Sequence, residues 1–354
     1  MNFKLLIINP GSTSTKIAIF DDEQNSLEKS IAHSPKELMA FEKIWDQLAI
    51  RQRALQAFLA ESKYRPVDFS AIVGRGGLLR SVPGGTYQIS ARMLEDARIG
   101  LQGEHAANLG CALAYELAQA AGIPAFIVDP ISVDEFEPIA RYSGHPLIQR
   151  RSLSHTLNLH AAGREAARRL GEDFIAANFV IAHLGGGISI CPLKGGKIID
   201  VNDASSDGPF SPERTGGLPL QPFINLCFSG NYTKQQVKKL VMGEGGLLAY
   251  TGTSSAREIE KRIHEGDSAT KEIYLAMAYQ IAKEIGAMAT VLDGNVRAIV
   301  ISGGLANSDL LVSWIKKRIA FIAEVLVLPG EFEMQALAHG ALRVLRGEER
   351  AKQY

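Results

Sequence analysis

The residues best suited to chemistry lie in short polar turns that follow apolar segments. Residues 9–16 read NPGSTSTK, directly after the apolar run 5–8 and directly before the apolar run 17–20. Backbone N–H groups beside a glycine, serine hydroxyls and a lysine ammonium all donate hydrogen bonds to phosphoryl oxygens. This hairpin is therefore a candidate phosphate site, and an ordinary Ser/Thr hairpin is the alternative. Its candidate ligands are Asn9, Gly11, Ser12, Ser14 and Lys16.

Two further glycine turns follow apolar segments later in the chain. Residues 179–184 lead into three successive glycines, and residues 298–302 lead into a pair. Glycine lets a backbone approach a nucleotide closely, and two strand–turn–strand units about half a chain apart suggest a duplicated domain with a ligand between its halves. His183 before the first of these turns is either a ligand contact or a structural histidine. The candidate residues are His183, Gly185, Gly186, Gly187, Gly303, Gly304 and Asn307.

Two charged residues follow predicted strands in the first half of the chain. Arg75 lies between glycines after the short apolar run 71–73, and Asp129 follows the run 125–128. Ligands gather at the carboxyl ends of strands in open α/β sheets, so we expect Arg75 on a loop that reaches an anion. A surface arginine is the alternative for Arg75, and a cap of the turn before Pro130 is the alternative for Asp129.

The elements that must position these residues alternate between strand and helix patterns, which indicates an α/β fold. A capping box at Ser34 predicts a helix over 34–60, and other helices are expected over 106–121, from 155 to 170, over 268–292 and over 333–346. The irregular segment 202–218 is rich in glycine and proline, as active-site loops are. We place a domain junction between residues 149 and 150, which gives domains 1–149 and 150–354. The last helix is a candidate to pack back on the first domain, and the charged tail from residue 347 is expected to fray.

Composition excludes several classes of partner. The chain has 354 residues, with 38 basic and 38 acidic side chains, so its net charge of zero argues against nucleic acid or an anionic membrane as a main partner. The apolar run 5–8 is too short for a signal peptide or a membrane span, and we expect a cytoplasmic protein. Three widely separated cysteines support neither a disulfide framework nor a zinc site.

These motifs resemble the acetokinase family of the sugar kinase, Hsp70 and actin superfamily. Residues 9–16 match the family's N-terminal signature of Asn, any residue, Gly, Ser, Ser/Thr, Ser, any residue and Lys, and the similarity runs over essentially the whole chain. The resemblance implies a two-domain actin-like ATPase fold, in which a duplicated ribonuclease H-like unit forms a ligand cleft between the domains. It also implies a homodimer or a larger homo-oligomer.

The activity implied by the resemblance is reversible, ATP-dependent phosphorylation of a short-chain carboxylate. Butyrate is the expected acceptor, because Gly186 and Arg75 stand where the acetate-phosphorylating members have other residues. Acetate, propionate and isobutyrate remain alternatives, because one methylene contributes only about 0.8 kcal/mol of burial. A module that closes on ATP without transferring phosphate is the rival from another class.

The resemblance also implies roles for individual residues. Arg214, Asp129 and His155 match active-site positions, and Arg75 lies near the position of a first-domain arginine. Two arginines and Mg²⁺ would neutralise the phosphoryl group in flight, and His155 would donate a hydrogen bond. The acceptor carboxylate is already ionised at neutral pH, so no general base is needed. The two glycine-bearing turns would hold the phosphates of ATP or ADP, Gly303, Gly304 and Asn307 the adenosine, and Asp129 with Glu333 the metal.

Overall fold

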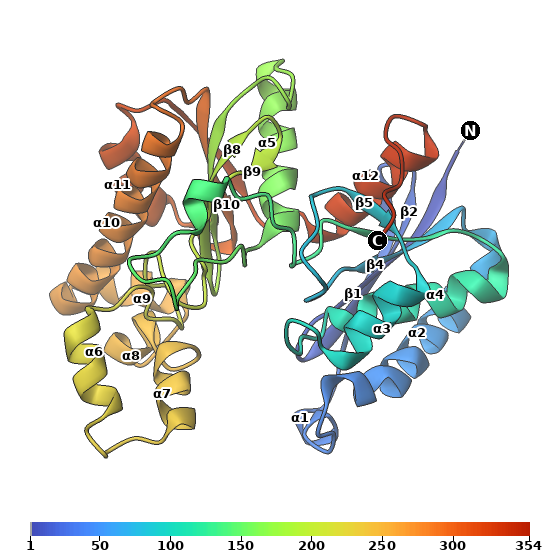
Figure 1. Ribbon diagram of the computed structural model, residues 1–354, viewed down its shortest axis with the longest axis horizontal. Helices are drawn as coiled ribbons and strands as arrows, with labels where there is room; N and C mark the ends of the chain where they lie inside the picture. Colours follow the sequence, from blue (N-terminus) through green and yellow to red (C-terminus); the bar gives the residue numbers. More distant parts are fainter. Residues whose placement is uncertain (1) are drawn as a thin grey trace. The chain divides into compact units, whose positions relative to one another are not determined.

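The computed structural model describes residues 2–354, and they form two compact units. The first unit runs to Asp134 and includes Phe332–Tyr354, and the second unit is Glu135–Glu331. The last helix, coloured red in Figure 1, therefore belongs with the N-terminal part of the chain. The junction proposed between residues 149 and 150 lies inside the second unit.

The first unit is built on a mixed sheet with the strand order β3-β2-β1-β4-β6-β5. Strands β1, β4 and β6 run parallel, while β2 and β3 form an antiparallel extension at one side. This confirms the predicted strand–turn–strand arrangement around the first polar turn. The strands are β1 (Lys4–Pro10), β2 (Ser14–Asp21), β3 (Gln24–Ala32), β4 (Ala71–Arg75), β5 (Thr86–Gln88) and β6 (Ala125–Val128).

Helices cover both faces of this sheet. Figure 1 shows α2, α3 and α4 on one face and α12 on the other, and α12 packs against β1, β4 and β6. Apolar side chains of the strands and of α2 and α4 form the core on the first face. The helices are α1 (Pro35–Leu38), η1 (Ile44–Gln47), α2 (Leu48–Ser62), η2 (Pro66–Asp68), α3 (Ala91–Ile99), α4 (Asn108–Ala121) and α12 (Glu333–Leu345).

The continuous helix predicted over 34–60 is wrong. α1 ends at Leu38, and α2 begins only at Leu48. The side chain of Ser34 forms no capping hydrogen bond, and Met39 is 84% exposed. A helix through this segment would bury little apolar surface, and most helical stability in proteins comes from such burial.

The glycines around Arg75 serve helix packing rather than a mobile loop. Arg75 is the last residue of β4 and is buried, which corrects the expectation that it lies on a loop. A Cβ on Gly74 would lie 2.6 Å from the carbonyl carbon of Gly110 in α4. The absence of side chains at these two positions therefore lets the helix and the strand approach closely.

The predicted fraying of the tail is also wrong. The N–H of Lys352 donates to the Thr86 carbonyl at 2.8 Å, and the N–H of Gln88 donates to the Lys352 carbonyl at 3.1 Å. The hydroxyl of Tyr354 donates to Asp96 at 2.9 Å. The tail is held along the edge strand β5 by these bonds.

The second unit has a mixed sheet with the strand order β11-β10-β7-β8-β9. β7, β10 and β11 are parallel, and β7 pairs with β8 as a second antiparallel strand–turn–strand unit. This confirms the predicted recurrence of the arrangement. The strands are β7 (Phe179–Leu184), β8 (Ile188–Lys194), β9 (Lys197–Ile198), β10 (Ala298–Gly303) and β11 (Glu324–Pro329).

Helix α10 packs against β7 and β8, whereas α5 packs against β7 and β10 from the other face. The long helix predicted over 268–292 is confirmed, as is the helix that follows His155. The helices are η3 (Pro138–Arg141), α5 (Thr156–Leu170), α6 (Leu220–Cys227), α7 (Lys234–Val241), α8 (Gly246–Thr251), α9 (Ala256–His264), α10 (Ser268–Val291), η4 (Gly304–Asn307) and α11 (Asp309–Ile319).

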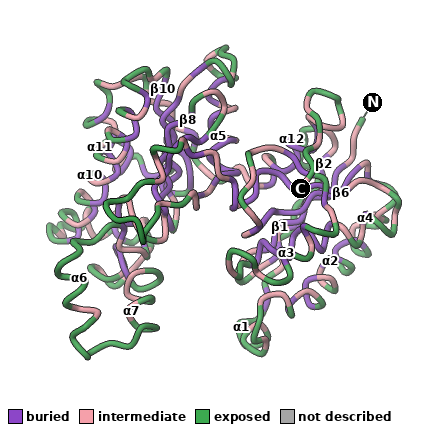
Figure 2. The backbone as a smooth tube through the Cα atoms, viewed as in Figure 1, coloured by how far each residue is buried: buried purple, intermediate pink, exposed green. Residues whose placement is uncertain are grey.

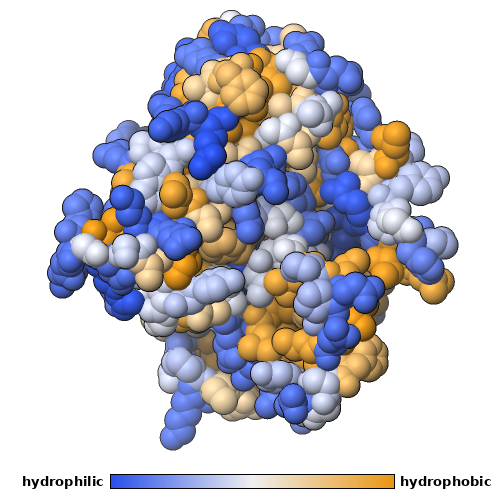
Figure 3. All heavy atoms as spheres, turned by 90° about the vertical axis from the view of Figure 1, so that its left-hand side faces the viewer, coloured by the Kyte–Doolittle hydropathy of each residue, from blue (hydrophilic) through white to orange (hydrophobic). Residues whose placement is uncertain are grey.

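Helices α6 and α7 contain no buried residue, and Figure 2 shows their backbone in green and pink, the colours of exposed and intermediate residues. Figure 3 shows apolar surface in the lower part of the face that carries the second unit. Exposed apolar side chains of this region include Leu220, Ile224, Phe228, Tyr232 and Met242. Among residues 2–354, no helix is both long enough and apolar enough to cross a membrane.

Candidate functional site

The first polar turn presents backbone donors to solvent. Gly11 N–H donates to the carbonyl of Ser14 at 2.8 Å, which closes the turn on its inner side. Ser12 and Thr13 are exposed, and their backbone N–H groups donate to no acceptor within residues 2–354. Unpaired N–H groups on adjacent residues of an exposed turn are suited to binding an anion.

Two predicted ligands flank this turn on the same face of the hairpin. Asn9 in β1 lies directly opposite Lys16 in β2, and directly opposed residues project their side chains to one side of a sheet. Asn9 Nδ2 donates to Glu333 Oε2 at 2.7 Å, although the two residues are 324 positions apart in the chain. The start of α12 therefore lies over the base of the turn.

Glu333 also joins Arg75 to this group. Arg75 Nη2 lies 3.6 Å from Glu333 Oε1, and the side chain of Arg75 is only 6% exposed. Arg75 Nη1 is buried and has no hydrogen-bond partner within residues 2–354. Such an atom retains capacity to bind an anion that reaches it. The structure thus brings Asn9, Arg75 and Glu333 together.

Asp129 lies at the end of β6, beside the strand that ends at Arg75. Its φ of 39° is left-handed, a conformation that aspartate tolerates better than most residues. Asp129 Oδ1 accepts a hydrogen bond from Gly85 N–H at 2.6 Å, and Asp129 N–H donates to the Gly85 carbonyl at 3.0 Å. The position at the ligand edge of the sheet follows the prediction, and the carboxylate also fixes the loop around Gly85.

In the second unit, the two histidines singled out in the sequence lie side by side. The ring centroids of His155 and His183 are 4.8 Å apart. His155 Nδ1 is 2.9 Å from the hydroxyl of Ser189, and His183 Nδ1 is 3.4 Å from the hydroxyl of Ser302. His183 is 2% exposed, so the strands β7, β8 and β10 fix both rings.

Arg214 lies against the second glycine turn. A Cβ on Gly187 would be 2.7 Å from Cζ of Arg214, so only glycine leaves room for the guanidinium there. Arg214 Nη1 donates to the carbonyl of Ala204 at 3.0 Å. Burial lowers the pKa of Arg214, yet a guanidinium remains protonated near neutral pH. A cation is therefore fixed beside backbone groups suited to phosphate.

The loop that carries Arg214 is held from both sides. Ser211 Oγ donates to the carbonyl of Gly186 at 2.6 Å, which ties the loop to the glycine turn. Leu247 N–H donates to the Ser211 carbonyl at 3.1 Å, and Gly243 N–H to the Glu213 carbonyl at 2.8 Å. The start of α8 thus supports the loop from behind.

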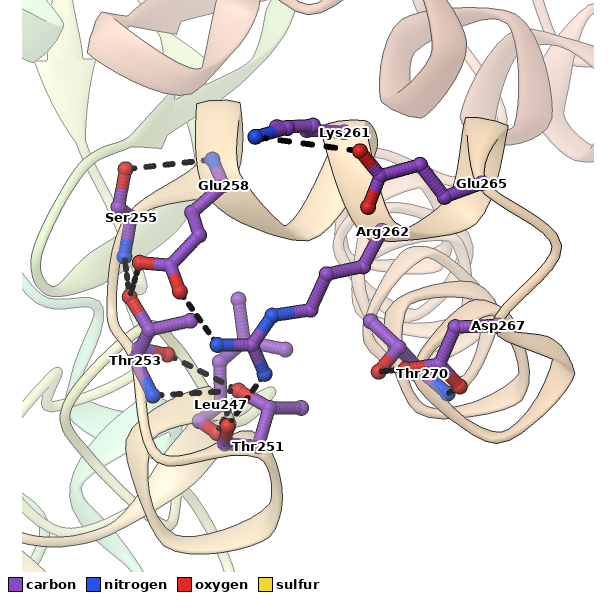
Figure 4. A network of polar contacts seen from close by, with 10 residues as sticks. All are labelled: Leu247, Thr251, Thr253, Ser255, Glu258, Lys261, Arg262, Glu265, Asp267 and Thr270. Carbon is purple, nitrogen blue, oxygen red and sulfur yellow. Dashed lines mark hydrogen bonds and ion pairs between the residues drawn. The ribbon is translucent and has the colours of Figure 1, made fainter.

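Figure 4 shows how α8 is fixed in turn. Thr251 Oγ1 donates to the Leu247 carbonyl at 2.8 Å, and Arg262 in α9 donates to the Thr251 carbonyl at 2.8 Å. Ser255 caps the start of α9 through the N–H of Glu258, and Glu258 pairs with Arg262. This network stabilises the support of the Arg214 loop without contributing a ligand itself.

Sequence reasoning missed a second support of this loop. Arg151 Nε lies 2.8 Å from Asp203 Oδ2, and Asp203 Oδ1 accepts from the N–H of Ser205 at 2.9 Å. Burial alone would raise the pKa of Asp203, but hydrogen bonds from Ser205 and Arg151 outweigh it and lower the pKa. The ionised Asp203 thereby fixes the turn whose Ala204 carbonyl binds Arg214. The sequence signal that could have found it is the pair of adjacent arginines, Arg150 and Arg151. They bind two aspartates that are three residues apart, Asp200 and Asp203.

The third glycine turn lies at the carboxyl end of β10, next to β7. Gly303 has a φ of 91° and exchanges two backbone hydrogen bonds with Gly330, at 3.1 and 3.0 Å. Gly304 and Asn307 are both exposed, and Asn307 Nδ2 donates to the Gly304 carbonyl at 2.9 Å. The register pairs Ser302 with His183, so this turn and the second glycine turn belong to the same sheet edge.

The predicted site residues thus fall into one group per unit. The first unit gathers Asn9, Arg75 and Glu333 around the polar turn, with Asp129 on the strand next to Arg75. The second unit gathers His155, His183, Arg214 and its two glycine turns. Within residues 2–354, no three His, Cys, Asp or Glu side chains are grouped so that they would hold a metal ion by themselves.

The fold and these two groups define an α/β protein with a polar, glycine-bearing turn in each unit. A model of the acetokinase family matches residues 142–325. Butyrate kinase 2 of Clostridium acetobutylicum is 47% identical over 355 residues, covering 100% of both chains. A probable butyrate kinase of Listeria welshimeri is 48% identical over the same length and coverage. The chain therefore belongs to the acetokinase family.

Solved structures agree on the fold. The acetate kinase of Porphyromonas gingivalis superposes with a TM-score of 0.80 at 19% identity and covers 97% of this chain and 100% of its own. A propionate kinase of Francisella tularensis gives a TM-score of 0.74 at 19% identity, covering 96% and 98%. The predicted α/β fold is confirmed.

Proposed function

We propose that this protein transfers the γ-phosphoryl group of ATP to butyrate, giving butyryl phosphate and ADP in a reversible reaction. The observation that carries the proposal is the guanidinium of Arg214, fixed against Gly187 in a glycine turn. Relatives named butyrate kinase, which match over the whole chain at 47–48% identity, support the choice of substrate.

The reaction joins two anions, so positive charge is the main requirement. One carboxylate oxygen of butyrate forms a bond to the γ-phosphorus, and the bond from that phosphorus to the β–γ bridging oxygen breaks, leaving ADP. Arg214 neutralises the charge that spreads over the transferred group, and His155 donates a hydrogen bond to it or to the substrate carboxylate. Butyrate is already ionised at neutral pH, so no residue has to remove a proton.

In this proposal, residues of the first unit also bind phosphate. The N–H groups of Ser12 and Thr13, the side chains of Asn9 and Ser14 and the ammonium of Lys16 bind phosphate oxygens. Arg75 is the second arginine for the phosphoryl group, and its unpartnered Nη1 supports this role. Gly303, Gly304 and Asn307 in the second unit bind the adenosine.

Mg²⁺ fits the carboxylates of the first unit. It prefers oxygen ligands and is usually bound through one or two carboxylates together with substrate phosphates and waters. Asp129 and Glu333 supply two such carboxylates, one at the end of β6 and one at the start of α12. When bound, the ion would neutralise charge on the β- and γ-phosphates. Glu333 would hold it while keeping Asn9 in place through the existing hydrogen bond.

The test is formation of acyl hydroxamate from ATP, Mg²⁺ and a carboxylic acid, measured as initial rates for acetate, propionate, butyrate and isobutyrate. We expect the highest kcat/KM with butyrate. A higher kcat/KM with acetate, propionate or isobutyrate would replace butyrate as the substrate but keep the reaction. No hydroxamate with any of the four acids, in a protein that still binds ATP, would favour a nucleotide-dependent switch module instead.

The proposal also includes assembly into a homodimer or a larger homo-oligomer through α6 and α7. These helices expose contiguous apolar side chains, and Phe228 is 86% exposed. They also line a cavity of about 610 Å³ whose walls include Phe223, Val237 and Met242. An exposed apolar patch of this kind is typical of a protein interface.

A further inference from the structure

A fully buried arginine lies behind the first polar turn. Arg51, in α2, is 0% exposed. Its Nη1 donates to the backbone carbonyl of Ser14 at 2.9 Å and to the hydroxyl of Thr15 at 3.1 Å. Its Nη2 donates to Gln47 Oε1 at 3.1 Å. Every acceptor of this guanidinium is therefore neutral.

No carboxylate compensates the charge of Arg51 within residues 2–354. It forms no ion pair, and its Nε has no hydrogen-bond partner. Burial lowers the pKa of Arg51, but the guanidinium stays charged at neutral pH. An uncompensated buried charge is strongly destabilising, because the desolvation penalty is not offset by a partner.

The titratable group that shares the hydroxyl of Thr15 with Arg51 is His33. His33 Nε2 is 2.8 Å from the hydroxyl of Thr15, and the N–H of His33 donates to the Thr13 carbonyl at 2.8 Å. Burial and the charge of Arg51 lower the pKa of His33 and outweigh the charge of Glu37, which acts to raise it, so His33 is neutral near pH 7. Arg51 is therefore the cation that lies directly beneath the turn, and none of its hydrogen-bond acceptors carries a charge.

We propose that Arg51 is a positioning residue for phosphate at the first turn. Its charge attracts the phosphoryl groups, and its hydrogen bond to the Ser14 carbonyl fixes the turn that carries the N–H groups of Ser12 and Thr13. The Ser14 carbonyl accepts from both Arg51 and Gly11, so the inner side of the turn is fixed at one atom. This inference rests on the proposed function only in that the turn binds the phosphates of ATP.

The size of the effect follows from Coulomb attraction. Two unit charges roughly 10 Å apart, at an effective dielectric constant of about 20, interact by about 1.7 kcal/mol, which corresponds to more than a tenfold change in affinity. The effect should grow with the charge of the ligand and vanish for adenosine, which has no phosphate.

The sharpest variant keeps Arg51 and gives it a partner. Gln47→Glu is isosteric and places a carboxylate where the Gln47 amide oxygen now accepts from Nη2. We expect the variant to melt no lower than the wild type, because a buried cation gains a counter-ion. We also expect ATP and ADP to bind at least about tenfold more weakly by calorimetry, with unchanged affinity for adenosine.

Two substitutions of Arg51 complete the test. Arg51→Met removes the charge and should weaken ATP but not adenosine, whereas Arg51→Lys keeps the charge and should bind ATP within about threefold of the wild type. If Arg51→Met does not fold, Gln47→Glu and Arg51→Lys decide the question.

Equal weakening of ATP and adenosine, or unchanged ATP binding in Gln47→Glu, would overturn the proposal. These measurements use binding alone, so they are independent of whether the wild type forms an acyl phosphate. A wild type that binds ATP but makes no product would reject the proposed reaction and leave the role of Arg51 to be decided by the variants.

Discussion

The contact between Gly187 and Arg214 makes Gly187→Ala the most informative substitution. The added methyl carbon would lie 2.7 Å from Cζ of Arg214, whereas carbon atoms in contact are about 3.5 to 4.0 Å apart. The guanidinium must therefore move by about 1 Å. A displacement of this size at a positioned catalytic group lowers the rate by about a hundredfold, or about 2.7 kcal/mol of transition-state stabilisation.

A double-mutant cycle separates this effect from damage to the turn itself. Arg214→Ala alone should lower kcat by two or more orders of magnitude with little change in melting temperature. Because the three atoms nearest to the added methyl all belong to Arg214, adding Gly187→Ala to Arg214→Ala should cost less than about threefold more. The rates are initial rates of butyryl hydroxamate formation at saturating ATP.

Gly186→Ala is the control for folding, because its methyl would meet no atom within 4 Å. It should melt at the wild-type temperature. The reasoning is refuted if Gly187→Ala keeps near-normal kcat, or if it costs as much in the Arg214→Ala background as alone. In either case Arg214 would not act from the position it occupies beside the turn.

Three further measurements follow from the structure. Burial raises the pKa of Asp207 to about 6, so ionisation of this carboxyl lowers the free energy of unfolding as pH rises from about 4 to about 6. In urea unfolding, Asp207→Asn should therefore raise the free energy of unfolding by about 1 kcal/mol at pH 8 and leave it unchanged at pH 4. An equal gain at both pH values would contradict this. Removing residues 351–354 should lower the melting temperature by about 5 °C. It should also lower kcat, because Lys352 donates to the Gly84 carbonyl next to the loop that Asp129 fixes. An unchanged kcat would show that the tail does not affect the site. Phe228→Ser should lower the molar mass measured by light scattering towards that of the monomer. Phe321→Ser is the control, because Phe321 is equally exposed but lies outside α6 and α7, and it should leave the molar mass unchanged. An unchanged molar mass with Phe228→Ser would place the interface elsewhere.

Local chemistry in the sequence was enough to find the turns and the strands around them. Two apolar runs, 5–8 and 17–20, flank a short polar turn. This pattern predicts a strand–turn–strand unit. The length and glycine content of the segment 202–218 marked it as a candidate active-site loop, and the resemblance to the acetokinase family singled out Arg214 within it. In each case the signal lies within about twenty residues of the residue it identifies.

The position of Arg75 could not be predicted in this way. A glycine beside an arginine is compatible with a mobile loop and with close helix packing, and only the approach of Gly110 in α4 decides between them. The same holds for the tail, because the acceptor of Lys352 is Thr86, more than two hundred residues earlier. Charge and composition predicted fraying there, but backbone hydrogen bonds to an open strand edge outweighed them.

Arg51 was missed for a related reason, and its case shows which information a sequence lacks. An arginine in an amphipathic helix is normally solvated, so nothing in residues 48–62 distinguishes it from its neighbour Arg53. What distinguishes it is the hairpin that covers it, through the carbonyl of Ser14 and the hydroxyl of Thr15. The charge of a phosphate site is therefore the sum of the residues that touch the ligand and those buried behind the turn. Only the folded chain reveals the residues buried behind the turn. Gln47 is far in the sequence from every predicted ligand, yet Gln47→Glu should weaken ATP binding because the new carboxylate would pair with Arg51.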